Sequence, residues 1–129
     1  MKKVVIDTNV LVSSVLSGDG NPSKVMNLVS KKKVKLFYSK EIISEYKRVL
    51  EYEKLNITPY LREEVIKKVV DLGTQVDPIV SSVPLTDEDD RTFYDTAKEN
   101  DAILVTGNVR HYPDDSTIMT PSAFLDKFK

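Results

Sequence analysis

Three acidic residues, Asp7, Glu45 and Asp90, occupy positions where a carboxylate is unusual. Asp7 directly follows a run of β-branched residues that ends at Ile6, while Glu45 and Asp90 adjoin the apolar stripes of two predicted helices. Carboxylates that lie together repel one another and need a divalent cation, and hard oxygen ligands suit Mg²⁺ or Mn²⁺. A metal held in this way could position a water molecule and polarise a phosphate for in-line displacement.

Each acid also has a simpler structural interpretation. Asp7 and Asn9 are favoured helix-capping residues, so the opening stretch alone supports capping and a ligand role equally. Asp90 also fits a helix N-terminus, where the helix dipole favours negative charge. Glu45 lies beside the apolar stripe of its helix, and a carboxylate there is costly unless a cation receives it. Asp95 lies off the stripe of its own helix and is expected at the surface.

The stretch ILVTGN repeats the arrangement at Asp7, because an apolar strand again ends in polar residues. Thr106 ends this strand and Asn108 follows it, on either side of Gly107, whose missing side chain makes the backbone permissive. We therefore expect Thr106 and Asn108 to lie beside the three acids named above.

Short β-rich runs alternate along the chain with segments of helical periodicity. The predicted strands lie at residues 3–6, 34–39, 74–80, 102–106 and 116–120. The predicted helices are 10–16, one capped at Asn21-Pro22, one capped by Ser39, one from Thr58-Pro59 to Gly73, about 90–99, and a short one after Pro121. Pro78 cannot donate a hydrogen bond to a neighbouring strand and therefore places 74–80 at a sheet edge.

This alternation predicts an α/β fold, in which a mostly parallel central sheet is covered by helices on both faces as a three-layer α/β/α sandwich. In such sheets ligands bind in the crevice beyond the carboxyl ends of the strands. Asp7, Thr106 and Asn108 all lie at the end of a predicted strand or just beyond it. The fold therefore predicts that they enter the same crevice.

The composition limits the kinds of site that the chain can form. A chain of 129 residues with 40% hydrophobic content is expected to form a single domain over residues 1–129. No segment approaches the roughly 20 apolar residues of a membrane span, so we expect a soluble, cytoplasmic protein without a membrane partner. Zero cysteines and a single histidine, His111, exclude thiolate and multi-histidine metal sites. Any metal must therefore be held by oxygen.

The net charge of −1 does not provide the broad basic field that is typical of nucleic-acid-binding proteins. Only local basic patches remain. The densest patch is better explained as a solvated helix end that complements the helix dipole, and it comprises Lys31, Lys32, Lys33 and Lys35.

Taken together, these stretches resemble the PIN-domain nucleases, and in particular the PIN-type toxins of prokaryotic toxin-antitoxin pairs. The opening motif is VVIDTNVLVS, the second-acid helix is YSKEIISEYKRVL, and the third-acid helix with its strand is DEDDRTFYDTAKENDAILVTGN. The likeness covers nearly the whole chain. It implies an α/β/α sandwich and an endoribonuclease that uses Mg²⁺ or Mn²⁺, with RNA as substrate, an antitoxin protein as partner and frequent homodimers.

Carried over to this chain, the resemblance makes Asp7, Glu45 and Asp90 the catalytic acids and metal ligands. It makes Asn9 and Thr106 their polar support. A rival assignment, a phosphotransferase of the haloacid-dehalogenase type with Asp7 as nucleophile, is disfavoured because it needs a second aspartate where Asn9 stands.

One position departs from the family pattern. The family commonly has a fourth acid after the TG or TR of that strand, where this chain has Asn108 as a neutral ligand. In relatives that read TxN, an acid comes three residues later, where this chain has His111, which we interpret as a surface loop residue. Either alignment leaves one carboxylate fewer. The alternative function is therefore a catalytically weak or silent PIN-like domain that binds protein or RNA.

Overall fold

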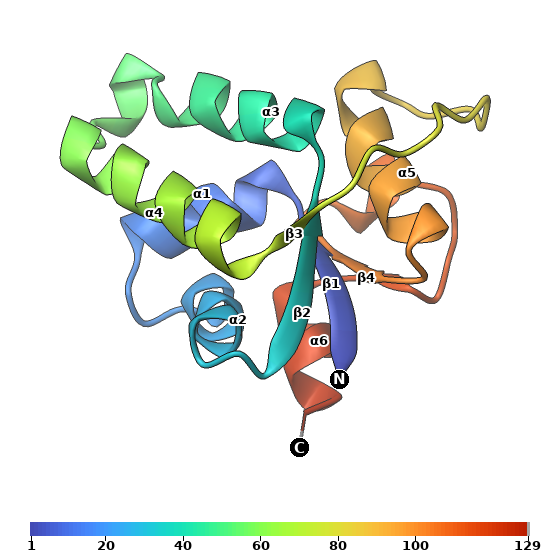
Figure 1. Ribbon diagram of the computed structural model, residues 1–129, viewed down its shortest axis with the longest axis horizontal. Coiled ribbons are helices and arrows are strands. Elements are labelled where there is room, and N and C mark those ends of the chain that lie inside the picture. The colour runs from blue at the N-terminus through green and yellow to red at the C-terminus, as the bar shows by residue number, and fades with distance from the viewer. Residues whose placement is uncertain (129) are drawn as a thin grey trace.

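The computed structural model describes residues 1–128, within which five strands form one all-parallel sheet in the order β3-β2-β1-β4-β5 (Figure 1). The strands are β1 (Lys2–Ile6), β2 (Val34–Tyr38), β3 (Thr74–Gln75), β4 (Ile103–Val105) and β5 (Ile118–Met119). The α-helices are α1 (Thr8–Leu16), α2 (Asn21–Ser30), α3 (Lys40–Leu50), α4 (Pro59–Leu72), α5 (Arg91–Glu99) and α6 (Pro121–Asp126). Short 3₁₀ turns are η1 (Glu53–Leu55), η2 (Glu88–Asp90) and η3 (Val109–His111).

Helices cover both faces of this sheet. In Figure 1, α1 to α4 lie on one side of the strands and α5 lies on the other, where it packs against β1, β2 and β4. Helix α6 packs against α2. The predicted α/β/α sandwich is confirmed, and the parallel pairing of β1 with β4 brings their carboxyl ends to the same edge.

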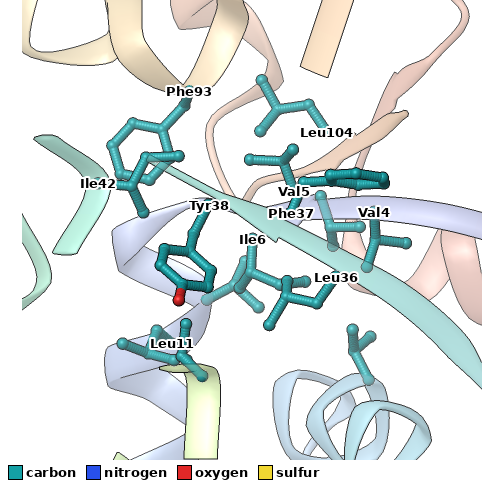
Figure 2. Close-up of a cluster of buried hydrophobic side chains, with 14 of the residues drawn as sticks. Val4, Val5, Ile6, Leu11, Leu36, Phe37, Tyr38, Ile42, Phe93 and Leu104 are labelled. Atoms are coloured by element: carbon teal, nitrogen blue, oxygen red, sulfur yellow. The ribbon is translucent and has the colours of Figure 1, made fainter. Parts of the chain in front are cut away.

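The central strand β1 forms the middle of the hydrophobic core. Val4, Val5 and Ile6 are fully buried, since β1 lies between β2 and β4 and helices cover both of its faces. Figure 2 shows these side chains between Phe93 of α5 and Leu11 of α1. Each fully buried aliphatic side chain of this kind contributes about 1.5–3 kcal/mol to folding. The run of β-branched residues before Asp7 is thus explained by the position of its strand.

Each predicted strand and helix has a counterpart, although several boundaries differ. Helix α1 begins at Thr8 rather than at residue 10, and Asp7 is its N-cap. The N-cap of α2 is Gly20 rather than Asn21, which is already helical. Capping preferences locate a helix start only to within one or two residues, because adjacent polar residues compete for the position.

The predicted strand at residues 74–80 is much shorter than expected, because β3 ends at Gln75. It does lie at the edge of the sheet, next to β2. Beyond it, Pro78 has no N–H to donate, and the N–H of Ile79 donates to Oε2 of Glu99 at 2.7 Å. The chain therefore leaves the sheet here and crosses towards α5, as the yellow segment in Figure 1 shows.

Asp95 is buried, so its predicted surface position is wrong. Only 5% of Asp95 is exposed, and its Oδ2 accepts the N–H of Ser81 at 2.9 Å. The guanidinium of Arg91 donates to the carbonyl oxygen of Ser81 at 2.8 Å, which holds the same segment at a second point. The periodicity of α5 identifies its sheet-facing stripe only. It carries no information about an irregular segment that covers another face of the helix.

The basic patch lies at the surface. Lys31, Lys32 and Lys33 are exposed in the turn that follows α2, and Lys35 is exposed on β2. Across residues 1–128, no helix combines the length and the apolar character needed to cross a membrane.

Gly73 marks a close approach between α4 and β2. A Cβ atom here would lie 2.7 Å from the carbonyl oxygen of Val69 and 2.9 Å from a ring carbon of Tyr38. We expect Gly73→Ala to lower the free energy of unfolding by about 1–3 kcal/mol, because the backbone must shift to relieve the contact. Gly18→Ala is the matched control, since nothing lies within 4 Å of its Cβ position. Equal urea midpoints for the two variants would contradict this prediction.

Candidate metal centre

The register between β1 and β4 places Asp7 beside Thr106. Ile6 pairs with Val105 in the parallel ladder, and the N–H of Asp7 donates to the carbonyl oxygen of Val105 at 2.9 Å. Both strands therefore present their first polar residue at the same edge of the sheet. Asp7 is 5% exposed and Thr106 is fully buried, and the Thr106 hydroxyl donates to Oδ2 of Asp7 at 2.8 Å.

The carboxylate of Asp7 accepts hydrogen bonds at both oxygens. Oδ1 accepts the N–H of Thr8 at 2.8 Å, and Oδ2 also accepts the hydroxyl of Tyr112 at 2.9 Å. Asp7 is therefore a helix cap and a member of a polar cluster at the same time. Burial raises the pKa of Asp7, while the hydrogen bonds from Thr106, Tyr112 and Thr8 oppose this rise by stabilising the charged form.

Tyr112 is a site residue that the sequence analysis missed. Its side chain is buried at the end of η3, and its hydroxyl lies close enough to influence the pKa of both Asp7 and Asp90. Burial, followed by the negative charges of Asp7 and Asp90, raises the pKa of Tyr112, so the hydroxyl stays protonated as a donor. The only signal in the sequence is a tyrosine in a loop beyond a strand end, because a short turn has no periodicity to interpret.

Asn9 ties the loop after β4 to the start of α1. Its Oδ1 accepts the N–H of Gly107 at 2.8 Å, and its Nδ2 lies 3.5 Å from the hydroxyl oxygen of Thr106. The backbone N–H of Asn108 also donates to this oxygen, at 3.0 Å. The side chain of Asn108 is exposed, and within residues 1–128 no hydrogen bond joins it to the acids.

Asp90 lies at the N-cap of α5, yet its side chain makes no capping hydrogen bond in the described structure. Its Oδ2 is buried and has no hydrogen-bond partner among the described residues. Burial, followed by the negative charge of Asp7, raises the pKa of Asp90 to about 6. Nδ1 of His111 lies 3.7 Å from the same Oδ2, although half of the His111 side chain is exposed. Simple capping therefore does not account for Asp90.

Two hydrogen bonds hold the helices that carry the second and third acids. The hydroxyl of Tyr46 on α3 donates to the carbonyl oxygen of Ile6, the last residue of β1. The hydroxyl oxygens of Ser39 and Thr92 are 2.6 Å apart and join the start of α3 to α5. The start of α5 is thereby kept near the end of β1, where Asp7 lies.

Glu45 is held apart from the other two acids. Its two carboxylate oxygens accept hydrogen bonds from Arg48 at 3.0 and 2.8 Å, so Arg48 is the cation that receives this partly buried carboxylate. Among residues 1–128, no group of three or more histidine, aspartate or glutamate side chains is positioned to hold one metal ion. The structure therefore brings Asp7 and Asp90 together and leaves Glu45 beside Arg48.

The pair formed by Asp7 and Asp90 fits a divalent cation. It offers two carboxylates whose negative charges repel each other. One of their oxygens, Oδ2 of Asp90, is buried without a hydrogen-bond partner among the described residues. Asp7 and Asp90 would hold the cation, while Thr106 and Tyr112 would orient Asp7 from behind. The ligand roles of these acids, and of Glu45 and Asn108, stay predictions.

A family profile described as the PIN domain matches residues 3–110. The chain belongs to the PIN domain family. It is also 34% identical over 113 residues to the uncharacterized protein MJ1680 of Methanocaldococcus jannaschii, an alignment that covers 82% of this chain and 70% of that protein. PIN domains are typically nucleases and generally use divalent metals, which agrees with the resemblance noted in the sequence.

The contribution of Asp90 to the stability of the metal-free protein is expected to fall as the pH rises, because Asp90 has a higher pKa in the folded than in the unfolded chain. The stability that the protonated Asp90 carboxyl provides is fully present below pH 3.8, the ordinary pKa of an aspartate, and is lost as the pH rises through about 6. Relative to Asp90→Asn, the wild type should lose about 1–2 kcal/mol over this range, an amount reduced for solvent screening. Chemical unfolding at several pH values measures this difference, and a constant difference would contradict the prediction.

The fourth ligand position can be located by restoring its charge. His111 lies beside Asp90, whereas the Asn108 side chain is exposed and, within residues 1–128, makes no hydrogen bond to the acids. His111→Asp should therefore tighten Mn²⁺ binding roughly tenfold, which is the change in metal affinity typical of one supporting group. Asn108→Asp, which would restore the acid if the family's TG pattern applies, should then change the affinity little. Calorimetric titration with Mn²⁺ compares the two variants. The opposite ranking would return the fourth position to Asn108.

Proposed function

We propose that this PIN domain is an endoribonuclease that hydrolyses RNA phosphodiester bonds with Mg²⁺ or Mn²⁺. The observation that carries the proposal is the unpartnered, buried Oδ2 of Asp90 close to Asp7, at the carboxyl ends of parallel strands. Family membership supports a nuclease in general. RNA as the substrate is supported by the resemblance of the acid motifs to PIN-type toxins.

The residues around the pair would bind and orient the reactants. A bound divalent cation would supply a Lewis acid that stabilises charge on the phosphate and lowers the pKa of a water molecule. Thr106 and Tyr112 fix the direction of the Asp7 carboxylate, and Asn9 fixes the loop beside it. Attack by water on phosphorus with departure of the 3′ oxygen would leave a 5′-phosphate and a 3′-hydroxyl, as in related enzymes.

A cavity next to the loop after β4 offers hydrogen-bonding groups that suit a nucleotide substrate. It has a volume of about 420 Å³, and Asn9 and Gly107 connect it to the polar cluster around Asp7. Its other polar side chains are Ser13, Asn21, Asn108, Thr120 and Ser122. Amides and hydroxyls can both donate and accept hydrogen bonds, which suits the 2′-hydroxyl and the base edges of RNA.

A toxin role, with an antitoxin partner and a homodimer, is the finer part of the proposal and rests on the resemblance. An antitoxin is expected to bring a cationic side chain to Asp7 and Asp90, because two neighbouring carboxylates offer a charge-assisted contact. Isolation of the protein without a partner encoded beside its gene would count against this role.

The second candidate function is a silent domain that binds protein or RNA. The observation that favours it is that Glu45 is engaged by Arg48, so that two carboxylates rather than three meet at the crevice. The neutral Asn108 adds to this argument. A domain of this kind would bind no Mn²⁺ between Asp7 and Asp90, whereas the proposed nuclease would.

Purified protein is expected to cleave single-stranded RNA with Mg²⁺ or Mn²⁺, and excess EDTA should abolish this cleavage. Asp7→Asn should reduce cleavage by roughly 100-fold or more, because it removes a ligand charge. Its free energy of unfolding should be retained, since Asn caps helices as well as Asp and its amide can donate to the hydroxyls of Thr106 and Tyr112. Asp71→Asn, at an exposed position on α4, is the control for loss of charge.

Gel assays of RNA cleavage and thermal unfolding of the same preparations measure both effects. Cleavage that persists in EDTA would contradict the metal mechanism. A large fall in the melting temperature of Asp7→Asn would instead show that Asp7 serves mainly as a structural cap.

A further inference from the structure

The guanidinium of Arg48 lies between the carboxylate of Glu45, on the same helix α3, and that of Asp89 in the η2 turn. Its Nε donates to Oε1 of Glu45 at 3.0 Å and its Nη2 donates to Oε2 at 2.8 Å, which makes a bidentate pair within α3. The same Nη2 lies 3.8 Å from Oδ2 of Asp89, which is adjacent to Asp90 in the η2 turn. The guanidinium therefore spans the gap between α3 and the start of α5.

Tyr52 holds the guanidinium of Arg48 independently of Glu45. Nη1 of Arg48 donates to the Tyr52 hydroxyl, and the guanidinium carbon lies 5.7 Å from the centroid of the Tyr52 ring. Release of Glu45 would therefore leave Arg48 held by Tyr52, with its guanidinium near Asp89.

The contact between Arg48 and Glu45 is suited to exchange. The side chains are 50% and 18% exposed, and an exposed ion pair within one helix changes an equilibrium constant only about two- to fivefold. A cavity of about 410 Å³ runs along both side chains, next to Asp89, Arg91 and Thr92, so either side chain has room to rotate. A doubly charged cation attracts a carboxylate more strongly than a singly charged guanidinium at the same separation.

We propose that Arg48 is an internal counter-ion, which holds Glu45 in the metal-free protein and releases it to a divalent cation bound at Asp7 and Asp90. The exchange converts the pair of carboxylates into the three-acid set that the sequence predicts. Arg48 is thus a positioning residue that acts through Glu45. Its freed guanidinium can then bind a phosphate of the substrate, a consequence that rests on the proposed ribonuclease function, whereas the exchange rests on metal binding alone.

Titration of metal-depleted, full-length protein with Mn²⁺ tests the exchange without RNA, with free Mn²⁺ followed by electron paramagnetic resonance. Arg48→Gln removes the competing charge and should tighten Mn²⁺ binding about two- to fivefold. In a Glu45→Gln background the same substitution should leave the affinity unchanged, because the withheld ligand is absent. Equal tightening in both backgrounds would show a general effect of charge and would overturn the exchange. The absence of tightening in both backgrounds would also overturn the exchange.

A second measurement observes Arg48 directly. The ¹⁵N resonance of Arg48 Nε should shift when Mg²⁺ is added to the wild type and should stay in place in Glu45→Gln, while thermal unfolding confirms that each variant is folded. A wild type that cleaves RNA with Mn²⁺ but shows no Arg48 effect would overturn the exchange alone. A wild type that binds no Mn²⁺ would overturn both the exchange and the proposed function.

Discussion

The repulsion between Asp7 and Asp90 is the constraint on which the arrangement of this end of the sheet depends. Their proximity is unfavourable by itself, since burial and the charge of Asp7 raise the pKa of Asp90 to about 6. One oxygen of Asp90 is also buried without a hydrogen-bond partner. A fold keeps such an arrangement only where the surrounding contacts determine it more strongly than the repulsion opposes it.

Those contacts come from elements that are far apart in the chain. The fully buried β1 fixes the end of the central strand, and its register with β4 fixes Thr106 beside Asp7. The hydroxyl of Tyr46 joins α3 to the last carbonyl of β1, and the Ser39–Thr92 contact joins α3 to α5. Together these contacts leave Asp7 and Asp90 little freedom to separate. This preorganisation reduces the reorganisation that binding a cation would require.

The state of Glu45 separates the two candidate functions. With Glu45 bound by Arg48, the crevice holds two carboxylates and resembles a binding surface more than a complete metal centre. With Glu45 turned to a cation, it would hold the three acids that the PIN resemblance implies. Because the ion pair is partly exposed, it adds only a small amount to the free energy that opposes release of Glu45. Under the proposed exchange, metal affinity would depend on one half-exposed arginine.

The sequence by itself determined the alternation of strands and helices, and with it the parallel sheet that presents Asp7 and Thr106 at one edge. It could do so because apolar periodicity is a local property that shows which face of each element is buried. Only the tertiary structure decided that Tyr112, 105 residues after Asp7, donates to its carboxylate, and that an irregular segment buries Asp95. The tertiary structure also decided that Arg48 is the partner of Glu45. The sequence offers several basic residues after Glu45 and does not show which of them binds its carboxylate. Such contacts depend on how separate elements pack, which no local pattern encodes.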